Sequence, residues 1–191
     1  MKNTQPIRSK NQIRALAEYF LKKGQLRNYL LIILGLNTAL RISDLLRLKW
    51  GDVYDYKRMC FRVRIDIIEM KTRKTKSIAL NNNIINALSV LSANPEDMDC
   101  FLIENPRTKK AISRIQAYRL IRDASEALMF QSRVSCHSLR KTFGYHAWKS
   151  GVSPVIIMEI YNHSSLAVTR RYLGVTQDDK DEVYLGLDMT G

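Results

Sequence analysis

Three short segments of the sequence carry residue types that could break a phosphodiester bond. Such a reaction needs a nucleophile, a proton donor for the leaving oxygen, and fixed cations where negative charge grows. The sequence has no Walker loop, no HExxH motif and no carboxylate cluster at metal-ligand spacing, so we expect no metal or other cofactor, with cationic side chains in its place. The candidate groups, in chain order, are Arg41, Asp44, His137, Arg140, Asn162, His163 and Tyr172.

Arg41 lies at a predicted turn between two apolar segments, with Asp44 three residues further on. A guanidinium can bind two phosphate oxygens at once, and Asp44 could hold it in orientation. An Arg–Asp pair taken alone is also a common bridge on protein surfaces. This pair therefore indicates phosphate binding only together with other groups.

His137 and Arg140 are three residues apart, a spacing that puts both side chains on the same side of one helical turn. Near a helix N-terminus the backbone dipole also favours an anion, so the two side chains could meet one phosphate. A His-x-x-Arg pair also occurs by chance on basic helices. Tyr172 follows His163 by nine residues and could be presented to solvent at the end of a short helix, although a single tyrosine is more often a packing residue.

Together these groups resemble the tyrosine recombinase, or phage integrase, family. The resemblance runs from about residue 9 to residue 172, and the order and spacing of all six groups are hard to obtain by chance. The shared pattern is Arg41, Lys71 on a β-hairpin, His137-x-x-Arg140, His163 twenty-three residues after Arg140, and Tyr172 nine residues beyond His163.

The resemblance implies a role for each matched residue. Arg41 and Arg140 would clamp the scissile phosphate. Tyr172 would attack phosphorus and leave a 3′-phosphotyrosyl enzyme with a free 5′-hydroxyl. His137 would act as general acid and base, and His163 would hydrogen-bond the phosphate.

The same resemblance implies two further residue roles, and the sequence differs from the family pattern in two respects. Lys71 would protonate the leaving 5′-oxygen, and Asp44 would orient Arg41 without taking part in the chemistry. The residue before the second histidine is usually glycine; here it is Asn162, which tolerates positive φ, so the turn should survive. Family members commonly carry a helical DNA-clamp domain before the catalytic one, and we expect that domain to be missing. The chain would then be either a fragment of a longer integrase or a short recombinase resembling the fimbrial-switch invertases. The opening Met favours the short form.

Hydrophobic periodicity predicts the helices that position these groups. Ser9 begins a capping box, residues 26–37 are apolar almost all round as in a central helix, and Ser43 is predicted to cap a third helix. Further helices are predicted at about residues 83–92, 113–128, 138–149, 154–161, 166–173 and 179–187.

Alternating residues over 61–67 predict a strand, with a hairpin partner over 77–80. The predicted fold class is α+β and mainly α-helical, an integrase-type domain with a small antiparallel three-stranded sheet near residues 52–80. Long cations are expected to project from the hairpin tip at 71–76, and arginines from the helix at 113–128; a solvated turn and a solvated helix face are the alternatives. The predicted DNA-binding residues are Arg73, Lys74, Lys76, Arg114, Arg119 and Arg122.

Composition agrees with a nucleic-acid partner. The chain has 31 Lys plus Arg against 18 Asp plus Glu, a net charge of +13. The cysteines, Cys60, Cys100 and Cys136, form no CxxC pair, which argues against a disulfide framework or zinc site and favours a reducing compartment. The longest apolar run, residues 29–36, is too short to span a membrane, so we expect a cytoplasmic protein.

We expect residues 1–175 to form the catalytic domain and residues 176–191 a tail helix, which by resemblance would dock on a neighbouring subunit or otherwise pack on its own domain. The expected partner is double-stranded DNA with a specific recombination site, bound by a homo-tetramer, with accessory DNA-bending proteins as possible helpers. The reaction could serve integration, excision or inversion. The alternatives are a DNA-binding regulator, which would not need Tyr172 at this spacing, and a type IB topoisomerase, which shares the nucleophile and the arginine clamp.

Overall fold

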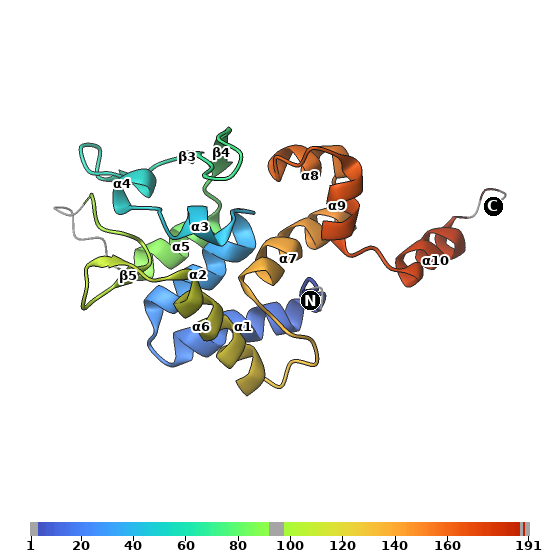
Figure 1. Ribbon diagram of the computed structural model, residues 1–191, viewed down its shortest axis with the longest axis horizontal. Coiled ribbons are helices and arrows are strands. Elements are labelled where there is room, and N and C mark those ends of the chain that lie inside the picture. The colour runs from blue at the N-terminus through green and yellow to red at the C-terminus, as the bar shows by residue number, and fades with distance from the viewer. Residues whose placement is uncertain (1–3, 92–97, 188, 190–191) are drawn as a thin grey trace.

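The computed structural model describes residues 4–91, 98–187 and 189. Within these residues the chain is mainly helical, as the periodicity predicted (Figure 1). The helices are α1 (Lys10–Lys22), α2 (Leu26–Asn37), α3 (Ile42–Leu45), α4 (Trp50–Val53), α5 (Asn82–Val90), α6 (Arg114–Ala127), α7 (Cys136–Lys149), α8 (Pro154–Ile160), α9 (Leu166–Leu173) and α10 (Gln177–Gly186).

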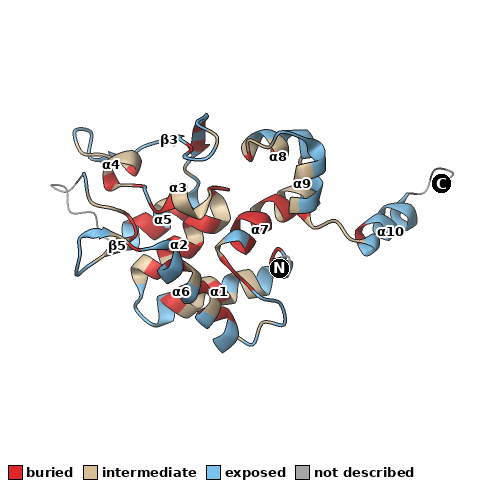
Figure 2. Cartoon of the chain, viewed as in Figure 1, coloured by how far each residue is buried: buried red, intermediate tan, exposed pale blue. Residues whose placement is uncertain are grey.

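Helix α2 is the centre of the molecule, as its nearly uninterrupted apolar sequence predicted. Leu30, Leu31, Ile32 and Leu34 are each at most 1% exposed. Helices α1, α5 and α7 pack around α2, and Figure 2 shows buried residues concentrated where they meet. No residue of α2 is exposed, so its packing fixes its C-terminal end, where the turn leads to Arg41.

Two predicted helix starts are confirmed and one is wrong. The hydroxyls of Ser9 and Ser113 accept hydrogen bonds from backbone N–H groups three residues later, at the starts of α1 and α6. Helix α3, however, begins one residue after Arg41, which is itself the N-cap. Ser43 therefore lies inside α3 and does not cap it.

The strands form three separate antiparallel hairpins within the described residues, so the prediction of a three-stranded sheet is wrong. The expected strand over residues 61–67 breaks because Arg62 donates its backbone N–H to Val53, and Val63 turns outward, 80% exposed. The hairpins pair β1 (Tyr54–Asp55) with β2 (Cys60–Phe61), β3 (Arg64–Ile68) with β4 (Thr75–Ala79), and β5 (Glu104–Asn105) with β6 (Lys110–Ala111).

The C-terminal helices form a second packing unit on α7. Helices α8 and α9 contact α7 and enclose a small core of Ala39, Ile157, Tyr161 and Leu173. Beyond α9, helix α10 extends away from the body of the molecule (Figure 1). This arrangement brings the end of α2, the start of α7 and the turn between α8 and α9 together.

Candidate active site

Arg140 joins three elements at the centre of the site. It lies in the first half of α7 and is 1% exposed. Its guanidinium donates to the backbone carbonyl of Ala39, after α2, and to that of Tyr161, at the end of α8, at 2.9 Å. Its Nε is buried without a hydrogen-bond partner within the described residues. A buried guanidinium held in this way is fixed in position before any ligand binds.

Tyr161 contacts Arg140 through both its hydroxyl and its ring. Its hydroxyl donates to the carbonyl of Arg140 at 2.6 Å, and its ring centre lies 4.5 Å from the guanidinium carbon. Burial raises the pKa of Tyr161, so the phenol remains a hydrogen-bond donor at neutral pH. Gly144 makes the close approach possible, because a Cβ at that position would lie 2.3 Å from the Tyr161 hydroxyl.

Arg41 takes its orientation from Glu69. Its Nη1 lies 2.8 Å from Oε1 of Glu69, which is 0% exposed at the end of β3. Oε2 of Glu69 accepts hydrogen bonds from Thr72 at 2.7 Å and from the amide of Asn162 at 2.9 Å. Although burial alone would raise it, these hydrogen bonds and the charge of Arg41 lower the pKa of Glu69, so it is ionised at neutral pH.

The expectation that Asp44 orients Arg41 is wrong. Oδ1 of Asp44 accepts the backbone N–H of Met70 at 2.9 Å and so ties the β3–β4 hairpin to α3. The i,i+3 argument fails because Arg41 is the N-cap, with an extended backbone, and its side chain does not follow the helical face. Asp44 positions the hairpin, and Glu69 on that hairpin positions Arg41.

Tyr172, on α9, lies beside both predicted catalytic histidines. Its hydroxyl is 3.4 Å from Nδ1 of His137, and its ring centre is 4.7 Å from that of His137 and 4.6 Å from that of His163. The ammonium of Lys141 lies 5.6 Å from the tyrosine ring centre. The structure therefore places the proposed nucleophile, Tyr172, next to a potential proton acceptor, His137, and near the cation of Lys141.

The turn between α8 and α9 presents His163. Asn162 has φ +52°, which confirms that asparagine can replace the glycine usual at this position. Nδ1 of His163 lies 3.0 Å from the hydroxyl of Thr169, which itself donates to the carbonyl of Ser165. Nδ1 of His163 is thus engaged by Thr169, and Nε2 is the ring nitrogen that a ligand would meet.

The surroundings keep both histidines neutral in the free protein. Partial burial is the largest cause, and nearby cations, Arg140 and Arg41 among them, add to it, so the pKa of both His137 and His163 falls to about 4. At pH 7 the rings are uncharged, and Nδ1 of His137 can accept a proton from Tyr172. A bound anion would oppose the cationic effect and raise both pKa values.

The β3–β4 hairpin carries the remaining predicted cations in two environments. Lys71, Arg73 and Lys74 are exposed on its turn, next to Glu69 in the chain. The expectation that Lys76 projects from the tip is wrong: it lies in β4, opposite Ile67, and is 9% exposed. Because side chains alternate along a strand, Lys76 faces the same way as buried Ile78, toward the body of the protein.

The α6 arginines are less uniform than their spacing suggested. Arg114 and Arg119 are exposed, whereas Arg122 is half-buried and lies 2.6 Å from Asp123 and 3.7 Å from Glu126. Arg122 already has acidic partners, so Arg114 and Arg119 are the freer candidates for phosphate contacts.

Two residues of the site, Glu69 and Tyr161, escaped the sequence reasoning, and Lys76 was predicted only as an exposed DNA contact. Each acts through the backbone or through an arginine, so none belongs to a recognisable motif. The one available signal was Glu69, an acidic residue between an apolar strand and a strongly basic turn. No group of three or more metal-ligating side chains occurs within the described ranges, and no described helix has the length and apolar character needed to cross a bilayer.

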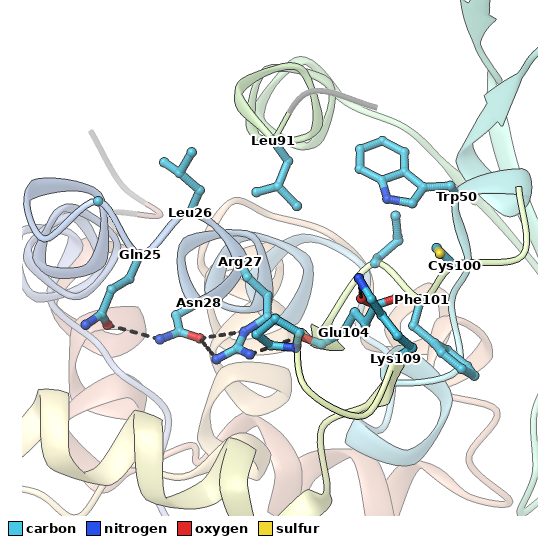
Figure 3. A pocket seen from close by; sticks show the side chains of 13 residues that line it. Gln25, Leu26, Arg27, Asn28, Trp50, Leu91, Cys100, Phe101, Glu104 and Lys109 are labelled. Atoms are coloured by element: carbon cyan, nitrogen blue, oxygen red, sulfur yellow. Dashed lines mark hydrogen bonds and ion pairs between the residues drawn. The ribbon is translucent and has the colours of Figure 1, made fainter. Parts of the chain in front are cut away.

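A separate hollow of about 700 Å³ contains none of the predicted site residues. Figure 3 shows its lining, with apolar Leu26, Trp50 and Leu91 around a polar floor. There Arg27 donates to the side chain of Asn28 at 2.8 Å and to the carbonyl of Glu104 at 3.0 Å. This hollow is therefore a different feature from the cluster around Tyr172.

The helical fold and the cluster of one tyrosine, two histidines and two arginines define a tyrosine recombinase catalytic domain. The model of the phage integrase family matches residues 8–178. The chain is 36% identical over 180 residues to the probable integrase/recombinase YoeC of Bacillus subtilis (strain 168), covering 94% of each protein. The chain therefore belongs to the phage integrase family, and the predicted family, fold and enzyme class are confirmed.

Solved structures share the fold. The crystal structure of XerA recombinase superimposes with a TM-score of 0.75 at 22% identity, over 96% of this chain and 66% of that one. XerH site-specific recombinase, solved bound to its palindromic difH substrate in a post-cleavage complex, gives a TM-score of 0.74 at 20% identity, over 96% of this chain and 53% of that one. The chain thus spans nearly all of YoeC but only about half to two thirds of these recombinases.

Proposed function

We propose that this protein cleaves and rejoins double-stranded DNA at a specific recombination site through a 3′-phosphotyrosyl intermediate. The observation that carries the proposal is the 3.4 Å approach of the Tyr172 hydroxyl to Nδ1 of His137, in the same site as Arg140. A neutral imidazole at that distance can take the phenol proton, which a phenol does not release readily at neutral pH without a base.

In the proposed reaction the Tyr172 oxygen bonds to phosphorus and the bond from phosphorus to the 5′-oxygen breaks. The tyrosine proton passes to His137, and Lys71 supplies a proton to the leaving oxygen. Arg41 and Arg140 offset the charge on the phosphate, which grows from about −1 toward −2 in the transition state. A 5′-hydroxyl from a second DNA end attacks the phosphotyrosine in the reverse step, which needs no ATP.

His163 and the exposed cations complete the proposed DNA contacts. With Nδ1 of His163 engaged by Thr169, Nε2 donates to a phosphate oxygen once the phosphate raises the pKa of the ring. The side chains proposed to meet other phosphates are those of Arg73, Lys74, Arg114, Arg119 and Arg122; Lys76, being buried, is not among them. Because these contacts release counterions, DNA affinity should fall steeply with added salt.

We propose that residues 1–175 form the catalytic domain and that the tail from residue 176 joins subunits into a tetramer on DNA. The start of α10 is anchored, because Asp179 lies 2.9 Å from the ammonium of Lys149. Its apolar side chains are not covered by their own domain: Tyr184 is 79% exposed and Leu185 is 88% exposed. A neighbouring subunit would bury them. We further propose that the reaction takes place in the cytoplasm, with or without DNA-bending proteins.

The test is covalent capture of DNA. The protein is incubated with a nicked, site-containing duplex that loses a short fragment on cleavage, and denatured adducts are resolved by electrophoresis. Wild-type protein and the control Tyr19→Phe, a change on the outer helix α1, should form the adduct, and Tyr172→Phe should not. An adduct that persists in Tyr172→Phe would exclude this nucleophile.

A further inference from the structure

Lys76 is a buried cation within the arginine site, and the reaction as described does not use it. It is 9% exposed, and its ammonium donates to the carbonyl of Thr38 at 3.2 Å and to that of Ala39 at 3.3 Å. Both carbonyls belong to the turn that leads from α2 to Arg41. Lys76 thus links the β3–β4 hairpin to this turn, 37 residues earlier in the chain.

The Ala39 carbonyl is the point where two cations meet. It accepts a hydrogen bond from Arg140 as well as from Lys76. Ala39 is 0% exposed, so water cannot take over these bonds, and its φ of +53° is an unfavourable conformation for a residue with a Cβ. Such a conformation persists only where its surroundings hold it, and here two donors do so.

The electrostatic setting makes a purely structural role for this lysine costly. Burial and the charges of Arg140 and Arg41 lower the pKa of Lys76 to about 8, and Glu69 and Asp44 only partly offset the effect. A folded-state pKa below the unfolded value means that the charged ammonium destabilises the fold at neutral pH. An apolar side chain of similar length would avoid that cost but could not hold the turn.

We propose that Lys76 is a positioning residue for the cleavage reaction: by holding the Thr38–Ala39 turn, it keeps Arg41 and Arg140 converging on one phosphate. The inference rests on the proposed function. Arg41 follows the turn by two residues, and Arg140 uses the same carbonyl as Lys76, so movement of the turn displaces both guanidinium groups together. Glu69, on the same hairpin, fixes the other end of Arg41.

The kinetic test compares Lys76→Met with wild type and with the control Lys22→Met, an exposed lysine on α1. Rates of adduct formation are measured in a single turnover at saturating DNA, and affinity is measured by fluorescence anisotropy. Because displacement by about 1 Å can cost about 100-fold in rate, we expect Lys76→Met to be slower by about that factor. Its affinity for DNA should stay within about threefold, since other cations make the phosphate contacts. An equal rate, or a loss confined to affinity, overturns the inference.

Two further measurements separate positioning from simple loss of folding and from failure of the proposed function. Thermal unfolding at pH 7 should show Lys76→Met at least as stable as wild type, and Lys76→Arg, which keeps the donors, should recover part of the rate. Hydrogen–deuterium exchange over residues 38–45 should increase in Lys76→Met even where no adduct is assayed. Unchanged exchange there would refute positioning by Lys76, whereas absence of adduct in wild type would refute only the reaction.

Discussion

Replacing Glu69 with glutamine should destabilise the protein because it removes the carboxylate that pairs with Arg41. Glu69→Gln keeps the side-chain shape but loses the 2.8 Å ion pair and weakens two hydrogen bonds, from Thr72 and Asn162. Removing one partner of a buried pair costs about 3–5 kcal/mol. Arg41 keeps some access to water, with 19% of its side chain exposed, so we expect a smaller loss of about 2–3 kcal/mol.

Urea unfolding at pH 7 measures this loss directly, and thermal unfolding should show a decrease in Tm of about 4–12 °C for a chain of this size. The pKa of Glu69 is lowered in the folded state, so its contribution is complete above the unfolded pKa and disappears as pH falls through the folded pKa. The difference between wild type and Glu69→Gln should therefore shrink toward pH 3. The control Glu126→Gln changes an exposed glutamate on α6 and should leave stability nearly unchanged.

The reasoning would be refuted by a Glu69→Gln protein as stable as wild type at pH 7, or by a difference that stays constant between pH 7 and pH 3. The first result would mean that Arg41 finds equivalent support elsewhere. The second would mean that the loss comes from packing and not from charge.

Three further predictions concern the site and the C-terminal tail. In NMR titrations His137 should change protonation near pH 4 in the free protein and at a higher pH in the DNA complex, because a phosphate offsets the cations that depress its pKa. Gly144→Ala should cost about 1–3 kcal/mol in urea unfolding, because its Cβ would lie 2.3 Å from the Tyr161 hydroxyl. Lys149→Gln should speed hydrogen exchange across α10, because the ammonium now lies 2.9 Å from Asp179.

Each of these has an internal comparison. His146 hydrogen-bonds the carbonyl of Ile7 outside the site, so its resonances should not respond to DNA. Gly186→Ala meets nothing within 4 Å and should leave stability almost unchanged. A DNA-independent titration of His137, a neutral Gly144→Ala or unchanged exchange in Lys149→Gln would each contradict the corresponding contact.

The parts of the fold that local patterns determine could be predicted from the sequence. Helix α2 needed only its nearly continuous apolar composition, and Ser9 marked the start of α1. Hydrophobic periodicity predicted a helix over residues 113–128, and α6 runs from Arg114 to Ala127. Asn162 was expected to tolerate the turn before His163, and its φ of +52° agrees, because the backbone preference of asparagine is a local property.

The errors arose where tertiary contacts decide the structure. Asp44 was paired with Arg41 on sequence spacing, but the carboxylate that reaches Arg41 comes from Glu69, on another element. Lys76 was taken as part of an exposed tip because four of the six residues 71–76 are basic, yet strand register turns it inward. Sequence spacing shows which residues are neighbours on one helix or strand, but not which elements pack together.

The distribution of charge prepares the site for a phosphate before DNA binds. Arg41, Arg140 and Lys76 lie together, and among the described residues the carboxylates of Glu69 and Asp44 offset part of their charge. Burial, with the remaining positive charge adding to it, keeps both histidines neutral. The excess positive charge costs stability in the free protein, and a bound phosphodiester would remove that cost. The same phosphate would raise the pKa of the histidines, so the groups that transfer protons become effective acids only when a substrate is present. Hydrogen bonds from Arg140 and Lys76 to buried backbone carbonyls hold these cations in place before the anion binds.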